Sequence, residues 1–206
     1  MEKRIILASS SRYRAKLLRQ AGIPFETMTP EGDEVLVQDI PLEEAVLRIA
    51  LQKMESVAAK ADPAIVIASD QLLASDDAIL GKPGNPEVAV RNLLEMAGKT
   101  HRLITALVVK DGYGGHIYSH VDVHEITFRN LSEIEVEHYV RLDRPLDCAG
   151  SFRIESLGIW LIERICGQDY TAIVGLPMLA LIDMLRKCGI TLLNVKENSG
   201  KGTAED

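Results

Sequence analysis

The chain of 206 residues has few cysteines and no long apolar run. Its three cysteines, Cys148, Cys166 and Cys188, are odd in number, widely spaced and without a CxxC pattern, so they indicate neither a disulfide framework nor a zinc site. No apolar stretch approaches the ~20 residues that cross a bilayer. The N-terminus leads into a short predicted strand without the features of a signal peptide. These absences predict a cytoplasmic protein with no membrane among its partners.

An excess of positive charge is also missing, and this argues against binding to a nucleic acid polymer. The formal net charge is −7 at pH 7, whereas non-specific binding to a phosphate backbone requires clustered Lys and Arg. An anionic ligand must therefore be attracted by a local cluster of positive charge. With 47% hydrophobic and 26% charged residues, the composition is typical of one large domain or of two small lobes that share a sheet.

Predicted strands and helices alternate along most of the chain. Short apolar runs indicate strands at residues 4–9, 25–28 and 64–70, and helical spacing indicates helices at 11–22, 41–60 and 177–189. Two long β-like runs, 100–109 and 116–128, flank a glycine-rich hairpin turn, and 158–165 is also strand-like.

Two further helices are indicated by their starting residues. Pro86 begins a short helix, and Ser132 with Glu135 forms a capping box for a helix that ends near Leu142. The whole pattern predicts an α/β domain with a mixed sheet over residues 1–193. The polar tail from residue 194 to 206 is expected to be disordered.

Asp70 is the first candidate for chemistry because it stands at the predicted end of an apolar strand. α/β proteins place their ligands at such an edge, and a Gly81-Lys82-Pro83 turn follows soon after. A carboxylate near a lysine suits a metal-bound polyphosphate, since the acid can hold the cation or activate water while the ammonium neutralises phosphate oxygens. The residues alone leave an alternative open, in which Asp70 caps a turn and Lys82 is solvated.

Other polar residues are weaker candidates for a functional site. The serines at 9–11 precede a predicted helix that carries Arg12 and Arg14, and together they form a corner suited to an anion. No GxSxG sequence marks a serine nucleophile, so helix capping is the favoured role of these serines. His120 and His124 share one strand face, but no third ligand follows at the spacing of a metal site.

Six segments, in order and with compatible spacing, resemble the signature of the Maf family of nucleoside triphosphate pyrophosphatases. They lie within residues 6–26 (ILASSSRYRAKLLRQAGIPFE), 33–34 (DE), 69–71 (SDQ), 79–83 (ILGKP), 149–152 (AGSF) and 174–177 (VGLP). The resemblance covers roughly residues 4 to 190. It implies an elongated α/β fold, in which a mixed sheet flanked by helices forms two lobes around a central cleft.

Within that family, the details look like the branch that acts on 7-methyl-GTP. The resemblance assigns substrate specificity to Tyr13, Gln71 and Glu155, whereas the branch for dTTP and UTP typically has threonine at the position of Gln71 and a glutamine-bearing segment around that of Glu155. It implies that Tyr13 stacks on the cationic base and that Glu155 accepts hydrogen bonds from two guanine donors. Gln71 is expected to donate a hydrogen bond to O6 of the base.

The resemblance also implies the remaining roles in the site. Asp70 would be the catalytic proton acceptor and would lie next to a divalent cation, Mg²⁺ or Mn²⁺, for which Glu34 would be a second acidic ligand. The residues expected to bind phosphate are Ser9, Arg14, Lys53 and Lys82. Two positions depart from the family pattern: Arg12 replaces the usual proline, and Ala15 replaces the second of two arginines.

The implied activity is hydrolysis of a nucleoside triphosphate to a monophosphate and pyrophosphate, which would remove a modified nucleotide from the pool. A homodimer is an assembly that the resemblance allows. Two alternatives stay open: the same chemistry on dTTP, UTP or other nucleotides, and a nucleotide-sensing regulator of septum formation that binds without useful turnover.

Overall fold

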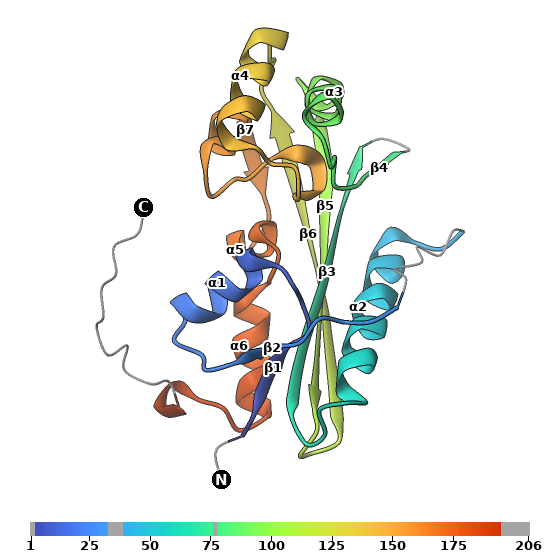
Figure 1. The fold of residues 1–206 in the computed structure, drawn as a ribbon, viewed down its shortest axis with the longest axis vertical. Helices are drawn as coiled ribbons and strands as arrows, with labels where there is room; N and C mark the ends of the chain where they lie inside the picture. The colour runs from blue at the N-terminus through green and yellow to red at the C-terminus, as the bar shows by residue number, and fades with distance from the viewer. Residues whose placement is uncertain (1–2, 33–38, 76–77, 195–206) are drawn as a thin grey trace.

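The computed structural model describes residues 3–32, 39–75 and 78–194 (Figure 1). In this part of the chain, one 7-stranded mixed sheet has the order β2-β1-β3-β5-β6-β7, and β4 pairs with the end of β3. The long central strands are β3 (Ile65–Ser75), β5 (Thr100–Asp111) and β6 (His116–Phe128). They run along the length of an elongated molecule.

Shorter strands and the helices complete the fold. The short strands are β1 (Ile5–Leu7), β2 (Glu26–Thr27), β4 (Ala78–Leu80) and β7 (Ile162–Cys166). The α-helices are α1 (Arg12–Gln20), α2 (Leu42–Ala58), α3 (Pro86–Met96), α4 (Glu133–Asp143), α5 (Tyr170–Val174) and α6 (Met178–Lys187). The 3-10 helices are η1 (Ala149–Ser151), η2 (Leu157–Leu161) and η3 (Leu192–Asn194).

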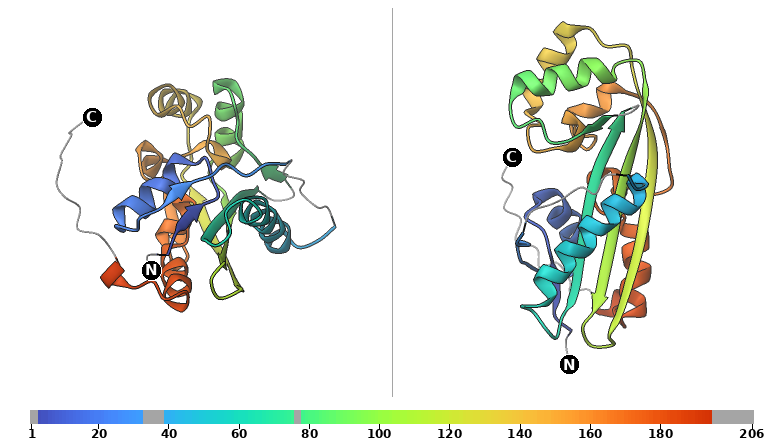
Figure 2. Two further views of the ribbon diagram at one scale, coloured as in Figure 1. Left: turned by 60° about the horizontal axis from the view of Figure 1, so that its bottom comes forward. Right: turned by 90° about the vertical axis from the view of Figure 1, so that its right-hand side faces the viewer.

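Helices cover both faces of the sheet in the lobe that contains β1 (Figure 2). Successive strand side chains point to opposite faces, so Val66 and Ala68 pack beneath α2 while Ile65 and Ile67 pack beneath α1 and α6. Both sets are buried. The continuous apolar run of β3 is therefore explained by two separate cores, one on each face of the sheet.

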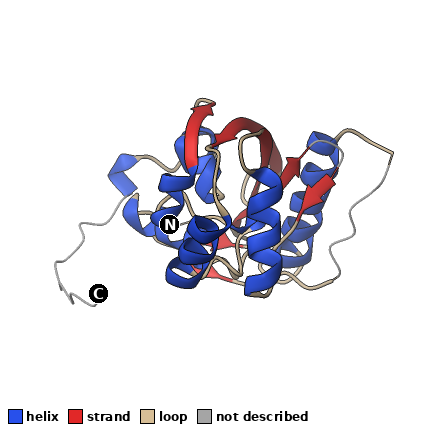
Figure 3. Cartoon of the chain, turned by 90° about the horizontal axis from the view of Figure 1, so that it is seen from above, coloured by secondary structure: helices blue, strands red, loops and turns tan. Residues whose placement is uncertain are grey.

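The second lobe lies at the other end of the long strands. Here α3, α4 and β7 enclose a third core, in which Phe128 of β6 packs edge to face on Phe152 with 5.3 Å between ring centroids. Figure 3 shows helices packed around the strands when the molecule is viewed from above. The predicted α/β fold with two lobes on a mixed sheet is confirmed. No helix in the described ranges is long and apolar enough to span a membrane.

Several sequence predictions are confirmed and others need correction. The hairpin between β5 and β6 and the capping box of Ser132 and Glu135 are present. The strand predicted to end at Asp70 instead continues to the end of β3, because β5 pairs with it as far as Ala74. The segment 158–165 is a strand only from Ile162, since η2 precedes it. Apart from residue 194, the predicted tail lies outside the described residues.

Candidate active site

The candidate site lies at a gap on one edge of β3. β1 pairs with residues 65–67 and β4 pairs with residues 73–75, so neither of these two strands pairs with residues 68–72. On its other edge, β3 is paired with β5 throughout this stretch. A cavity of about 690 Å³ adjoins the gap, a volume that suits a small-molecule ligand. Asp70 therefore reaches the cavity because β1 ends before it along this edge of β3. The prediction that its own strand ends there is wrong.

The cavity brings together all the predicted site residues that the structure describes. They are Ser9, Tyr13, Arg14, Lys53, Asp70, Gln71, Lys82 and Glu155. Glu34, the predicted second metal ligand, lies outside the described residues. The roles of these residues stay predictions, but their meeting around one cavity is a property of the fold that their separation in the sequence could not establish.

Asp70 points toward α2 and forms an ion pair there. Its Oδ1 lies 2.5 Å from Nζ of Lys53, and each side chain is 12% exposed. Water screens such a sheltered pair less than it screens a surface pair. Lys53, which was predicted to bind phosphate, therefore also neutralises Asp70 and fixes the orientation of its carboxylate.

The end of β1 and the start of α1 form a polar corner of the cavity. Ser11 caps α1 by accepting a hydrogen bond from the Arg14 backbone N–H at 3.4 Å. Ser9 Oγ accepts from the Ser11 N–H at 3.1 Å and from Nη1 of Arg14 at 3.3 Å. The Arg14 Nε donates to the Gly175 carbonyl oxygen at 2.8 Å, and Ser69 Oγ donates to the same oxygen at 2.9 Å. Arg14 is thereby anchored between α1 and the end of α5.

This corner carries positive charge suited to an anionic ligand. Arg14 and Lys53 line the cavity together with Lys82, which is exposed on the segment after β4. The first N–H groups of α1 add the positive end of a helix dipole. The molecule as a whole is negative, so this arrangement supplies the local cluster of positive charge that the sequence requires of an anion-binding protein.

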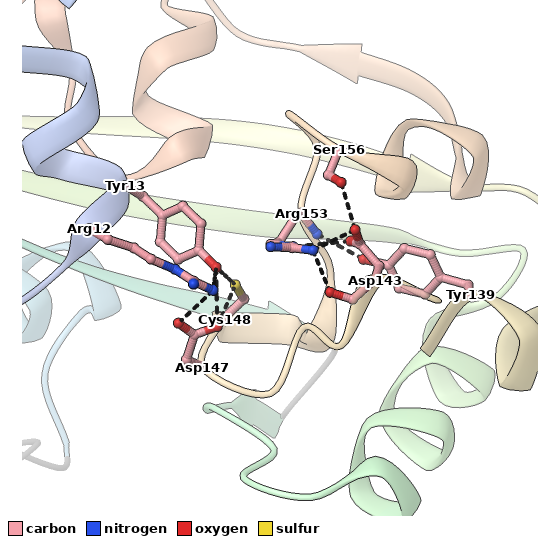
Figure 4. A network of polar contacts seen from close by, with 8 residues as sticks. All are labelled: Arg12, Tyr13, Tyr139, Asp143, Asp147, Cys148, Arg153 and Ser156. Carbon is pink, nitrogen blue, oxygen red and sulfur yellow. Dashed lines mark hydrogen bonds and ion pairs between the residues drawn. The ribbon is translucent and has the colours of Figure 1, made fainter. Parts of the chain in front are cut away.

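Tyr13 connects α1 to the loop before η1 (Figure 4). Its Oη donates to Asp147 Oδ1 at 3.2 Å and accepts from Nη2 of Arg12 at 2.8 Å, while the Cys148 thiol lies 3.6 Å away. Arg12 also forms an ion pair with Asp147 at 3.4 Å, and its guanidinium lies 4.9 Å from the centroid of the Tyr13 ring. Arg12, where the family usually has proline, therefore covers one face of this ring.

Burial affects the ionisation of two groups in this network. Burial, together with the hydrogen bond with Cys148, raises the pKa of Tyr13 to about 12. Burial also raises the pKa of Cys148 to about 12. At neutral pH both groups stay protonated, so Tyr13 can donate to Asp147, and Cys148 is not the thiolate that nucleophilic chemistry requires.

The segment that carries Glu155 is anchored to α4 by a buried ion pair. Nη2 of Arg153 lies 2.5 Å from Oδ1 of Asp143, and Ser156 Oγ donates to that oxygen at 2.6 Å. The Arg153 backbone N–H donates to the Tyr139 hydroxyl at 3.0 Å. Burial opposes the ionisation of Asp143, but the hydrogen bonds from Arg153 and Ser156 outweigh it and hold the pKa of this carboxyl below its ordinary value.

Gln71 is held by its amide nitrogen. The nitrogen lies 2.8 Å from the Ala172 carbonyl oxygen, 3.1 Å from that of Ile173 and 3.0 Å from Thr105 Oγ1. An amide NH₂ has only two protons, and both are directed at acceptors of the protein. Donation from Gln71 to O6 of a base, which would require the amide to leave these acceptors, stays a prediction.

Sequence reasoning missed the residues that hold the site in place. Asp147 and Cys148 directly precede the AGSF segment, but no spacing placed them beside Tyr13. Arg153 lies between residues that were singled out, yet its partner Asp143 belongs to another element. An isolated aspartate at the end of a predicted helix gives no sign that it is buried, so these contacts required the fold.

The comparison with known families decides what kind of protein carries this cavity. Residues 4–188 match the family described as Maf-like protein. This chain belongs to the Maf family.

Three curated relatives resemble this Maf chain over most of its length, and each is named a 7-methyl-GTP pyrophosphatase. The protein of Syntrophotalea carbinolica is 42% identical over 192 residues, covering 93% of this chain and 98% of the relative. That of Cupriavidus metallidurans is 44% identical over 90% of this chain and 93% of its own, and that of Alkalilimnicola ehrlichii 40% identical over 94% and 97%. A solved structure, the Staphylococcus aureus Ham1 protein, matches with a TM-score of 0.45 and 15% identity over 62% of this chain and 73% of its own.

The Maf resemblance implies a divalent cation, and the described residues can be tested for one. No three His, Cys, Asp or Glu side chains in the described ranges gather so that they could hold a metal ion by themselves. Mg²⁺, however, commonly binds one or two carboxylates and completes its shell with substrate phosphates and water. Asp70 fits that use, since Oδ1 accepts from Lys53 while no described residue is recorded as a partner of Oδ2.

Proposed function

We propose that this Maf protein hydrolyses 7-methyl-GTP to 7-methyl-GMP and pyrophosphate. One observation carries the proposal: three relatives with that name align with at least 90% of the chain. The cavity supports it, because a carboxylate held by a partly buried lysine lies among cationic side chains. These are the groups that attack on a polyphosphate requires.

In the proposed reaction, Asp70 accepts a proton from a water molecule that attacks the α-phosphorus. A new P–O bond forms there, and the bond between the α-phosphorus and the oxygen that bridges to the β-phosphorus breaks. Pyrophosphate leaves with that bridging oxygen, and the proton passes from Asp70 to solvent. Lys53 holds the Asp70 carboxylate in position through their ion pair.

The cationic side chains stabilise the charge that moves to the leaving pyrophosphate. A nucleoside triphosphate carries about four negative charges at neutral pH, which repel an attacking hydroxide. Arg14 and Lys82 would offset this charge, and Ser9 with the start of α1 would add hydrogen-bond donors. A divalent cation held by Asp70 and the phosphates, with Glu34 as a proposed second ligand, would lower the pKa of the attacking water.

The nucleobase is proposed to lie between Tyr13 and Glu155. Methylation at N7 makes guanine cationic, so it stacks on an aromatic face with a gain of roughly 0.5–2 kcal/mol over the neutral base. Arg12 already lies over the Tyr13 ring, so the base would stack on the opposite face. The Glu155 carboxylate can accept from N1–H and from the 2-amino group together, and the charge of the base strengthens both bonds.

A panel of nucleotides tests the proposed function. Purified protein is incubated with 7-methyl-GTP, GTP, dTTP and UTP, with Mg²⁺ and Mn²⁺ in turn, and monophosphate and pyrophosphate are measured together. We expect 7-methyl-GTP to give the highest kcat/KM and equal amounts of the two products. In H₂¹⁸O the label should enter the monophosphate, because water attacks the α-phosphorus.

Two other outcomes of the panel would overturn the proposal. A preference for dTTP or UTP would assign the chain to the other branch of substrates. Tight binding without turnover of any nucleotide would indicate the sensing regulator. Two further expectations also stay proposals: a cytoplasmic location, where the substrate pool would be, and a homodimer.

A further inference from the structure

Gln71 is fixed by its surroundings in one orientation of its amide. The Ala172 and Ile173 carbonyl oxygens can only accept hydrogen bonds, so the group that faces them at 2.8 and 3.1 Å must be the NH₂. Both carbonyls belong to the last turn of α5, where the Ala172 oxygen also accepts a hydrogen bond from the Gly175 N–H at 3.0 Å. Turning the amide over would place its oxygen against two carbonyl oxygens.

Thr105 contributes to the same orientation from the neighbouring strand. It lies directly opposite Gln71 in the pairing of β3 with β5 and is buried. Its hydroxyl donates its proton to the Ala172 carbonyl oxygen at 3.0 Å, so toward Gln71 it can only accept. Three acceptors therefore surround the amide nitrogen. The oxygen Oε1 is left for a ligand, because Gln71 lines the cavity and no described residue is recorded as a partner of that atom.

We propose that Gln71 reads a hydrogen-bond donor of the nucleobase, the 2-amino group of guanine, and that Thr105 is the positioning residue that keeps its oxygen turned to the cavity. The inference rests on the proposed function and names the group of that substrate which Gln71 contacts. Guanine presents three N–H bonds along its N1 and 2-amino edge. The Glu155 carboxylate can take N1–H and one amino hydrogen, which leaves the second amino hydrogen for Gln71.

The two acceptors that line the cavity, the Gln71 oxygen and the Glu155 carboxylate, give a rule for base selection. Uracil and thymine present a single N–H between two carbonyl oxygens, and those oxygens would meet the Gln71 oxygen or the Glu155 carboxylate. Adenine presents an amino group next to a ring nitrogen that only accepts. Guanine alone among these bases has adjacent donors, so the orientation of Gln71 favours guanine nucleotides whether or not N7 carries a methyl group.

Base analogues separate the two directions of the hydrogen bond. ITP lacks the 2-amino group, whereas 6-thio-GTP keeps it and replaces O6 with sulfur, a weaker acceptor. The kcat/KM of GTP, ITP and 6-thio-GTP is measured for the parent and for Gln71→Met, which has a similar length and no polar atom at its end. Loss of one hydrogen bond to a neutral acceptor corresponds to a change in kcat/KM of about three- to tenfold.

We expect Gln71→Met to reduce the preference for GTP over ITP by about three- to tenfold. The preference for GTP over 6-thio-GTP should stay within about twofold of the parent value, a change smaller than one hydrogen bond produces. An unchanged GTP to ITP ratio overturns the proposal, and a loss of the 6-thio-GTP discrimination would show that Gln71 donates to O6 instead.

Thr105 variants test the positioning role separately. Thr105→Val keeps the shape and removes the hydroxyl, so it should lower the GTP to ITP ratio in the same direction as Gln71→Met. Thr105→Ser keeps the hydroxyl and should restore the ratio, which a purely structural role of the methyl group would not allow. A Val variant with the parent ratio would remove Thr105 from the proposal.

Binding measurements keep this test independent of turnover. The affinities of GMP and IMP are measured by calorimetry for the parent and Gln71→Met. If the parent hydrolyses no 7-methyl-GTP but binds GMP more tightly than IMP through Gln71, the proposed function fails while the inference holds. If the parent hydrolyses 7-methyl-GTP and Gln71→Met leaves the GMP to IMP ratio unchanged, the inference alone fails.

Discussion

The ion pair between Arg153 and Asp143 offers a prediction that links stability to the site. The Asp143 side chain is 2% exposed and that of Arg153 is 19% exposed. Replacing Arg153 with Met leaves a buried carboxylate whose remaining side-chain hydrogen-bond partners are the hydroxyls of Ser156 and Tyr139. Breaking a buried pair by removing one partner costs about 3–5 kcal/mol. For a domain of this size, that corresponds to a fall in Tm of roughly 6–20 °C.

The loss of stability in Arg153→Met depends on pH, and its direction follows from the lowered pKa of Asp143 in the parent. In the parent, the pKa of Asp143 lies below its ordinary value, so the pair contributes stability above that ordinary value and loses it as pH falls through the folded pKa. In the variant, burial without Arg153 should raise the pKa of Asp143 instead. Lowering the pH from 7 to 5 should therefore narrow the gap in unfolding free energy between parent and variant.

Thermal and urea unfolding at the two pH values provide the measurements. Arg141→Met is the matched control, since Arg141 is an exposed arginine of α4 that contacts His138, and its loss should change stability by no more than about 0.5 kcal/mol. The double variant Asp143→Leu with Arg153→Met should recover much of the loss, because no buried charge remains. A cost below about 1 kcal/mol for Arg153→Met, in the range of an exposed pair, would refute the reasoning.

Three further predictions concern catalysis and specificity, each measured with 7-methyl-GTP. Asp70→Asn should reduce kcat by about 10²–10⁴-fold without unfolding the protein, because the amide cannot take a proton; a loss within about threefold would remove Asp70 as the base. Lys82→Ala should lower kcat together with kcat/KM, since its charge matters most as pyrophosphate leaves, and a change in KM alone would make it a tether of the ground state. Glu155→Gln should reduce the preference for 7-methyl-GTP over GTP, because the amide accepts from only one donor and has no charge; an unchanged ratio of the two kcat/KM values would contradict its role.

Site residues could be predicted where a local pattern or a family motif marked them, and not where a distant element sets their contacts. Asp70 was found because it ends an apolar run, although the run continues as strand to Ser75. Tyr13 and Glu155 were found through their place in family motifs. The orientation of Gln71 could not be inferred, because it is set by carbonyl oxygens of α5, a helix that the sequence pattern did not predict.

Local rules were sufficient for the elements and for the residues that could act. Alternation, caps and turn residues depend on neighbours within a few positions, so the hairpin of β5 and β6 and the Ser132 cap of α4 could be read from the chain. The type of residue likewise fixes which groups can carry charge or take a proton. By itself, then, the sequence determined most of the elements, the mixed α/β class and the candidate chemistry.

Only the tertiary structure decided which of these groups meet. The ion pair of Lys53 with Asp70 joins α2 to β3, that of Arg153 with Asp143 joins the Glu155 segment to α4, and the end of β1 opens the edge of β3. These contacts depend on how helices pack across a sheet, and packing is set by the summed burial of many apolar side chains. No local pattern encodes that sum, so the partners of Asp70, Gln71 and Arg153 became known only from the fold.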